Sequence, residues 1–141
     1  MTRIAVGMLL LLASAACSDS TGPDDSVPGG YTLTQLTYVQ LGHTRDAIEE
    51  GTVMHVTLTG DGTTTGSLHT PAASSESGSD EDVSLAGTWA FDADSTHISF
   101  NFPAAPGFLL AANPWAIVGS TLAFTYSSGD EFVVTATLTR N

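Results

Sequence analysis

Histidines are the side chains of this 141-residue chain best suited to bind a metal ion, and there are four: His43, His55, His69 and His97. A predicted β-hairpin places His55 and His69 on one outer face, diagonally across its two strands. We expect neither a cysteine nor a nearby carboxylate on that face, and two ligands are fewer than zinc sites use. We therefore predict no metal site and no cofactor, and we interpret the histidines as exposed strand residues.

Catalytic residue sets are missing from the sequence. It has no Gly-x-Ser-x-Gly elbow, no His-Glu-x-x-His motif, no phosphate-binding glycine loop and no lysine. The acidic run Glu76–Asp82 lacks the spacing of a calcium loop, so we interpret it as a solvated surface loop. We predict a protein that is not an enzyme. The alternative is an envelope enzyme or inhibitor whose site lies on Pro71–Asp82 or Pro103–Pro114.

Cys17 is the only cysteine, and the segment before it has the three zones of an export signal. Arg3 is followed by the apolar run Ile4–Leu12 and then by small residues. Ser14-Ala15-Ala16-Cys17 resembles the lipobox of bacterial lipoproteins, in which the cysteine sulfur receives a diacylglyceryl group and the chain is cut just before it. A single cysteine cannot form an intramolecular disulfide, which favours lipid attachment at Cys17. The predicted organisation is a signal peptide at 1–16, a lipidated cysteine with a disordered tether at 17–30, and one domain at 31–141.

Location and charge limit the partners of the mature protein. Two or three acyl chains would hold it to a membrane durably. Ser18 replaces the aspartate that retains lipoproteins in the inner membrane of well-studied Gram-negative cells, so the resemblance favours the outer membrane. The formal net charge is −12, which repels phosphate backbones and argues against nucleic-acid binding.

From Tyr31 onward, apolar and polar residues mostly alternate, as in half-buried β-strands. Thr52–Thr59 and Thr63–Thr70 flank the turn Gly60-Asp61-Gly62, and this loop length places Met54 opposite Leu68. The same register places Val56 opposite Gly66. Other predicted strands are Tyr31–Leu41 with a bulge, Val83–Asp92, Thr96–Phe102, Trp115–Val118, Thr121–Tyr126 and Glu131–Thr139.

Short connections between successive strands favour an all-β, antiparallel up-and-down barrel of seven to eight strands, with a β-sandwich as the alternative. We expect Arg45–Glu50 to form a single helical turn, and Phe108-Leu109-Leu110 to plug one end of the core.

Gly87-Thr88-Trp89, the step Trp115-x-Ile117-x-Gly119-x-x-Leu122 and a last strand running into Arg140 resemble small lipocalin-like lipoprotein domains of bacteria. The resemblance covers about the last sixty residues, and it implies a lipocalin-like barrel without implying a particular activity.

Aromatic side chains on the predicted inner faces form the candidate ligand-binding set Trp89, Phe91, Phe100, Trp115, Phe124 and Tyr126. An eight-stranded barrel is about wide enough for its own side chains, so we expect these residues to fill the interior. The alternative is an apolar pocket for a small hydrophobic ligand. The predicted function is that of a membrane-anchored binding or structural domain, with a small hydrophobic ligand or an envelope protein as its partner and no oligomeric state indicated.

Overall fold

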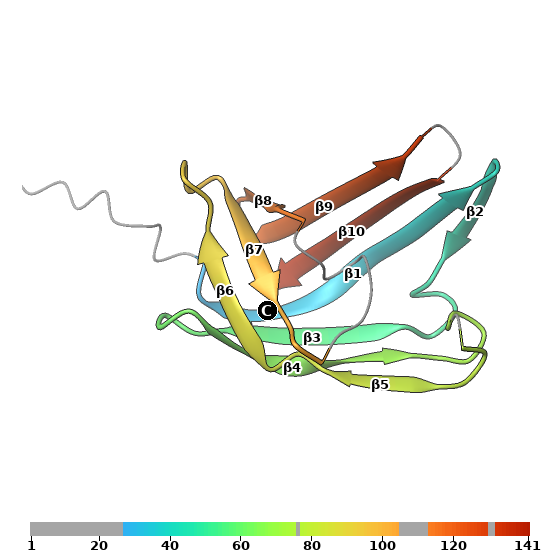
Figure 1. Ribbon diagram of the computed structural model, residues 1–141, viewed down its shortest axis with the longest axis horizontal. Coiled ribbons are helices and arrows are strands. Elements are labelled where there is room, and N and C mark those ends of the chain that lie inside the picture. Colours follow the sequence, from blue (N-terminus) through green and yellow to red (C-terminus); the bar gives the residue numbers. More distant parts are fainter. Residues whose placement is uncertain (1–26, 76, 105–112, 130–131) are drawn as a thin grey trace, which may run out of the picture.

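The computed structural model describes residues 27–75, 77–104, 113–129 and 132–141 (Figure 1). The predicted signal peptide 1–16, Cys17 and the segment Phe108-Leu109-Leu110 lie outside the described residues. Within the described residues, the chain is built of strands and turns without a helix. Accordingly, no helix there is long and apolar enough to cross a membrane.

Ten strands make up the described fold. They are β1 (Gly29–Gln40), β2 (His43–Asp46), β3 (Val53–Leu58), β4 (Thr63–Thr70), β5 (Glu81–Ser84), β6 (Gly87–Phe91), β7 (His97–Asn101), β8 (Trp115–Val118), β9 (Thr121–Ser128) and β10 (Phe132–Arg140).

Eight of these strands close into an antiparallel up-and-down barrel, which confirms the predicted fold class and excludes the sandwich. The order around the barrel is β1-β3-β4-β6-β7-β8-β9-β10, and pairing of β10 with β1 closes the ring. β2 lies beside β1, and β5 lies beside β4. β2 pairs with β1 beyond the point where β3 stops pairing with it, and β5 pairs with β4 beyond the point where β6 stops pairing with it.

β1 is long enough to pair with two strands along the same edge. Its start pairs with β3 and its end with β2, while β10 runs along its other edge. The predicted bulge is present as a register shift between Leu33 and Gln35.

The helical turn expected at Arg45–Glu50 was wrong for its first two residues, because Arg45 and Asp46 belong to β2. The rest is a hydrogen-bonded turn without a helix. Asp46 caps this turn by accepting from the backbone N–H groups of Ile48 and Glu49.

The β3–β4 hairpin has the predicted register, with Met54 opposite Leu68 and Val56 opposite Gly66. Gly62 takes a positive φ of 84° in the connecting turn, as a three-residue loop ending in glycine requires. A Cβ at position 66 would overlap the carbonyl oxygen of His55, so the two backbones approach closely there.

The strand predicted at Val83–Asp92 is interrupted. β5 begins at Glu81, two residues earlier than expected, and ends at Ser84, so the loop predicted at Pro71–Asp82 is shorter than expected. β6 begins only at Gly87, because Leu85 turns inward: its side chain is fully buried and its carbonyl oxygen accepts from the hydroxyl of Thr64 at 2.8 Å. The alternation of apolar residues continues across this break, so the sequence pattern does not reveal it.

Residues 27–30, the last four of the segment predicted as a tether at 17–30, belong to the fold. Val27 is 1% exposed, and its carbonyl oxygen accepts from the hydroxyl of Tyr31 at 2.6 Å. The guanidinium of Arg140 donates to the carbonyl oxygen of Pro28 at 2.7 Å. Gly29 leaves room for that guanidinium, since a Cβ there would lie 2.7 Å from its Nε.

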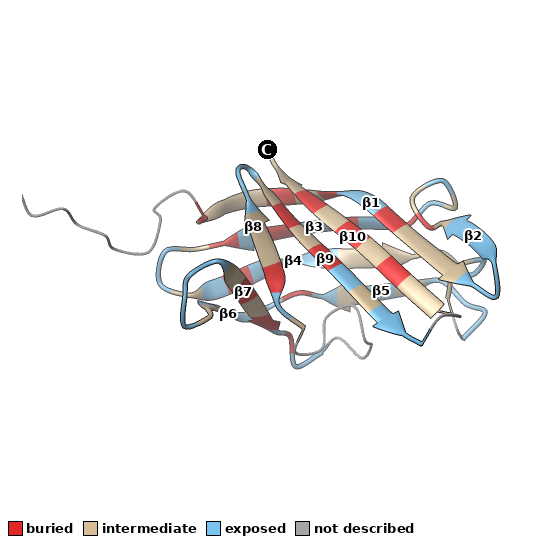
Figure 2. Cartoon of the chain, turned by 90° about the horizontal axis from the view of Figure 1, so that it is seen from above, coloured by how far each residue is buried: buried red, intermediate tan, exposed pale blue. Residues whose placement is uncertain are grey.

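The buried apolar residues form a single cluster, and along strands such as β9 and β10 they alternate with less buried residues (Figure 2). On β3 the alternation is strict, with the even-numbered residues buried and the odd-numbered residues exposed. In β10, Val134, Ala136 and Leu138 are fully buried and the residues between them are half-buried. This alternation gives the barrel one continuous core.

Candidate functional site

Four of the six predicted ligand-binding residues are packed against one another inside the barrel. Trp89, Phe100, Trp115 and Phe124 are between 1% and 8% exposed. The Trp115 ring stacks on Phe124, with centroids 5.3 Å apart, and meets Phe100 edge-on at 5.9 Å. These contacts have the geometry that aromatic pairs prefer in protein cores.

The other two predicted residues, Phe91 and Tyr126, are half-buried against the same cluster. Phe91 meets the Trp89 ring edge-on at 5.1 Å. The indole N–H of Trp89 donates to the carbonyl oxygen of Thr59 at 2.9 Å, which ties β6 to the β3–β4 turn. The structure thus places Trp89 among core residues with its polar group satisfied.

The opposite end of the barrel is built differently, and we call it the wide end. It is defined by four inward-facing, half-buried side chains: Tyr38, Leu68, Tyr126 and Phe132. Tyr38 and Tyr126 both lie opposite Val134 in the ladders of β10, and the rings of Tyr126 and Phe132 meet edge-on at 6.4 Å. In Figure 1, β9, β10 and β1 diverge here from β3, β4 and β5.

Short ladders explain this divergence. β4 pairs with β6 only through Thr63 and Thr64, and β7 pairs with β8 only through His97 and Ile98. In the described residues, β5 pairs only with β4, and β9 pairs with β8 only through Leu122 and its two neighbours. β6 is therefore joined to β4, and β8 to both of its neighbours, through only two or three residue pairs each.

Thr52 adds a buried polar atom to this apolar interior. It lies directly before β3, in line with the buried even-numbered residues of that strand, and it is 3% exposed. Its backbone N–H donates to the carbonyl oxygen of Ala47, but its hydroxyl oxygen is buried and has no hydrogen-bond partner. Among the described residues, it is the one buried side-chain polar atom found in this state. Such atoms are uncommon in folded proteins because each carries the cost of lost hydration.

An ion pair holds the turn after β2 against the loop after β4. The Arg45 guanidinium donates to both carboxylate oxygens of Glu50, at 3.0 and 2.7 Å, and to the carbonyl oxygen of Ala73 at 2.8 Å. The hydroxyl of Ser74 donates to the same carboxylate. The hydrogen bond from Arg45 is the largest cause of the lowered pKa of Glu50, and that from Ser74 is next. The Arg45 charge is thus already matched by a carboxylate.

The predicted positions of His55 and His69 are confirmed, since their strands pair in the expected register on the outer face. Each ring already has a neighbour: His55 Nδ1 lies 3.0 Å from the Thr32 hydroxyl, and His69 Nδ1 lies 2.9 Å from Asp82 Oδ1. The expectation of no nearby carboxylate was wrong, because β5 pairs with β4 and places Asp82 opposite His69.

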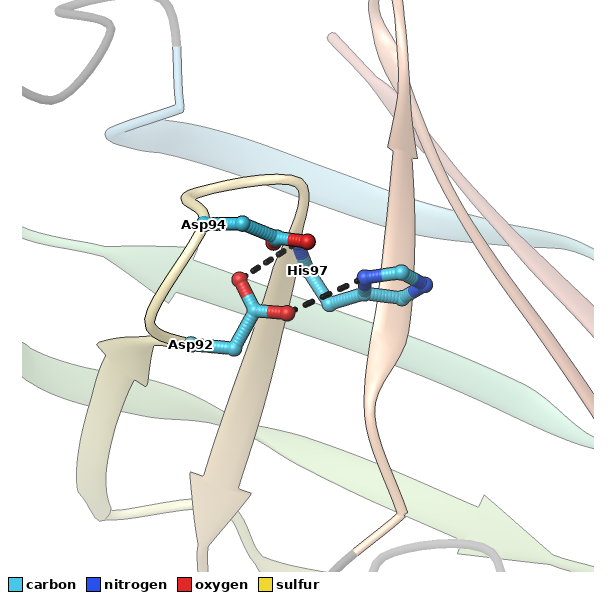
Figure 3. A group of neighbouring side chains, drawn as sticks. All are labelled: Asp92, Asp94 and His97. Carbon is cyan, nitrogen blue, oxygen red and sulfur yellow. Dashed lines mark hydrogen bonds and ion pairs between the residues drawn. The ribbon is translucent and has the colours of Figure 1, made fainter.

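Asp92, Asp94 and His97 form the one group of three potential metal ligands found in the described residues (Figure 3). Their ligand atoms lie within 4.8 Å of one another. Asp92 and His97 flank the turn between β6 and β7, and Asp94 lies within it. Two carboxylates and an imidazole are donors that zinc accepts.

Hydrogen bonds to the backbone account for the positions of both carboxylates. Asp92 accepts from the backbone N–H of His97 at 3.0 Å, and its other oxygen lies 3.1 Å from His97 Nδ1. Asp94 accepts from the hydroxyl and the backbone N–H of Thr96, and these bonds are the main causes of its lowered pKa. The geometry therefore supports capping of a tight turn as the role of this cluster.

Sequence reasoning missed this cluster because it considered His97 without its turn. A signal was present: Asp92 ends one predicted strand, Asp94 lies in the connection that follows, and His97 is the second residue of the next predicted strand. The pairing of Asp92 with His97, five residues apart, depends on how tightly that connection turns.

No known protein family, curated protein or solved structure matches this chain in the comparisons. Fold and site together define a class: a small antiparallel β-barrel with a packed aromatic end and a wide end.

Proposed function

We propose that this chain is a lipoprotein of the cell envelope, anchored through Cys17, whose barrel is a non-enzymatic binding or structural domain. The observation that carries the proposal is the lipobox-like Ser14-Ala15-Ala16-Cys17 directly after a short apolar run. The first buried residue of the fold is Val27, so residues 18–26 would separate the anchor from the barrel.

The point at which the chain joins the barrel gives the proposal an orientation. Gly29 lies opposite Leu58, next to the β3–β4 turn, and Pro28 is bonded to Arg140 near the C-terminus. This is the end of β1 away from Tyr38. Anchored there, the barrel would turn its wide end away from the membrane.

The positions of the acidic residues support a non-enzymatic role. Asp61 accepts hydrogen bonds from Thr59 and Thr63 in the β3–β4 turn. In the β6–β7 turn, Asp92 accepts from the backbone N–H of His97, and Asp94 accepts from that of Thr96. Carboxylates committed to capping backbone turns are structural by default, whereas catalytic carboxylates are usually held near a substrate-sized recess.

The test is replacement of Cys17 by alanine in the full chain, followed by cell fractionation and intact mass measurement. We expect wild-type protein to be cut before Cys17, to carry the mass of a diacylglyceryl group and to need detergent for extraction. The Cys17→Ala protein should remain an uncut precursor. Density-gradient separation of the membranes should place the wild-type protein in the outer membrane.

A substitution in the same segment serves as the matched control: Ser18→Ala leaves the cysteine intact and should be processed like wild type. Extraction of wild-type protein by salt alone, or an unmodified Cys17, would contradict the proposal.

A further inference from the structure

We propose that Asp61 is a latent site of isoaspartate formation, and that Thr59 and Thr63, which flank the β3–β4 turn, protect it from that spontaneous modification. The inference goes beyond the proposed function and depends on neither the lipid anchor nor a ligand.

The sequence of the turn favours this modification. In it, the backbone nitrogen of the residue after an aspartate attacks the Cγ of the aspartate side chain. The nitrogen loses its proton, the carboxyl group loses its hydroxyl group, the two leave as water, and a succinimide ring forms. Water then opens the ring at either carbonyl, which gives aspartate or isoaspartate. Asp61 is exposed, and Gly62 follows it, so no side chain hinders the attack.

Isoaspartate would damage this turn because it adds one carbon to the main chain. The register of the β3–β4 hairpin depends on the length of its loop, and it places Met54 opposite Leu68. β6 is tied to the same turn by Trp89. Its backbone N–H donates to the carbonyl oxygen of Gly62 at 2.8 Å, and its indole N–H donates to that of Thr59 at 2.9 Å. A longer main chain would disturb both the hairpin and its contact with β6.

Hydrogen bonds restrain both reacting groups in the folded turn. Oδ1 of Asp61 accepts from the hydroxyls of Thr59 and Thr63, and from the backbone N–H of Thr63 at 3.0 Å. The backbone N–H of Gly62 donates to the carbonyl oxygen of Thr59 at 3.1 Å. The attack pulls Cγ and the Gly62 nitrogen together, so it must distort or break these bonds.

The same bonds reduce the amount of the reactive form. The carboxyl group reacts when it is protonated, because a hydroxyl group then leaves as water. Hydrogen bonds from Thr59 and Thr63 stabilise the carboxylate and lower the pKa of Asp61 to about 2, from an ordinary value of 3.8. The protonated form is therefore scarcer in the folded turn than in the unfolded chain.

The experiment measures isoaspartate at position 61 in the chain as it is isolated from cells. After incubation at neutral pH, protease digestion and fragmentation mass spectrometry distinguish isoaspartate from aspartate. We expect folded wild type to form isoaspartate at least about ten-fold more slowly than the same chain unfolded in urea, because a hydrogen bond to a charged group is worth about that factor or more. This comparison tests the proposal without any substitution.

The double variant Thr59→Val with Thr63→Val tests the two hydroxyls. Valine keeps the shape of threonine and removes the donor, so isoaspartate formation in the folded variant should rise at least about ten-fold over wild type. Thr65→Val is the matched control: it makes the same substitution on β4 outside the turn, where residue 65 pairs with Thr57, and it should leave the rate unchanged.

A second control separates loss of protection from loss of stability. Trp115→Ala removes a core side chain from β8 and leaves the turn intact. It should lower the melting temperature but, while the chain is folded, form isoaspartate at the wild-type rate. Three results would overturn the proposal: equal rates in folded and unfolded wild type, equal rates in wild type and the folded double variant, or equal acceleration by Trp115→Ala.

Discussion

Replacing Trp115 with alanine tests whether the aromatic end of the barrel is a packed core. Trp115 is 1% exposed and touches Phe124 and Phe100 with the ring geometries of stable aromatic pairs. Truncating a buried aromatic side chain to alanine costs about 3–5 kcal/mol, because apolar burial is lost and a cavity remains. A domain of this size has a total stability of about 5–15 kcal/mol, so the variant would lose a large fraction of it.

The loss can be measured by urea unfolding and by thermal unfolding, with Trp89 fluorescence and circular dichroism as the probes. At about 4 °C per kcal/mol for a domain of this length, the melting temperature should fall by about 12–20 °C. Val118 provides the control on the same strand: it is 59% exposed, and Val118→Ala should change the unfolding free energy by less than about 0.5 kcal/mol. A loss below about 1 kcal/mol for Trp115→Ala would refute the assignment of this residue to the core.

Two further predictions concern a glycine and an acid in the turns and ladders. Gly87→Ala should destabilise the fold by at least about 2 kcal/mol in urea unfolding, because its Cβ would overlap the carbonyl oxygen of Asn101. Gly60→Ala is the control: it has open space around it and should be nearly neutral. Equal effects of the two substitutions would contradict the close approach of β6 and β7. Hydrogen bonds from two flanking threonines lower the pKa of Asp61 to about 2, so its stabilising effect should be complete above its ordinary value of 3.8 and should disappear as the pH falls toward 2. Melting temperatures recorded from pH 5 to pH 2 should fall less steeply for Asp61→Asn than for wild type, and parallel curves would show that these bonds do not matter.

Local sequence patterns predicted the hairpins well, because the information they need lies within a few residues. The register of Met54 opposite Leu68 follows from the loop length and from the need to keep both apolar faces inward. β2 was missed for the opposite reason. His43-Thr44-Arg45-Asp46 has no apolar alternation and is mostly exposed, so backbone pairing with β1 is what makes it a strand.

Long-range contacts set the features that the sequence did not predict. Val27 is a single apolar residue in a polar stretch, and its burial depends on Tyr31 and on the last strand of the barrel. The unpaired hydroxyl of Thr52 is a property of its surroundings, since threonine in a strand is ordinary and the sequence does not say which partners it lacks. The predicted barrel topology says whether a residue lies on the inner or the outer face, but not which residues it contacts there.

The two ends of the barrel connect the fold to the proposed function. A stack of aromatic rings gives the end near Val27 the packing that stability requires, so the other end can leave apolar side chains partly exposed and one hydroxyl unpaired. Under the proposed anchoring through Cys17, the chain enters the barrel at Val27, so the wide end would face away from the membrane.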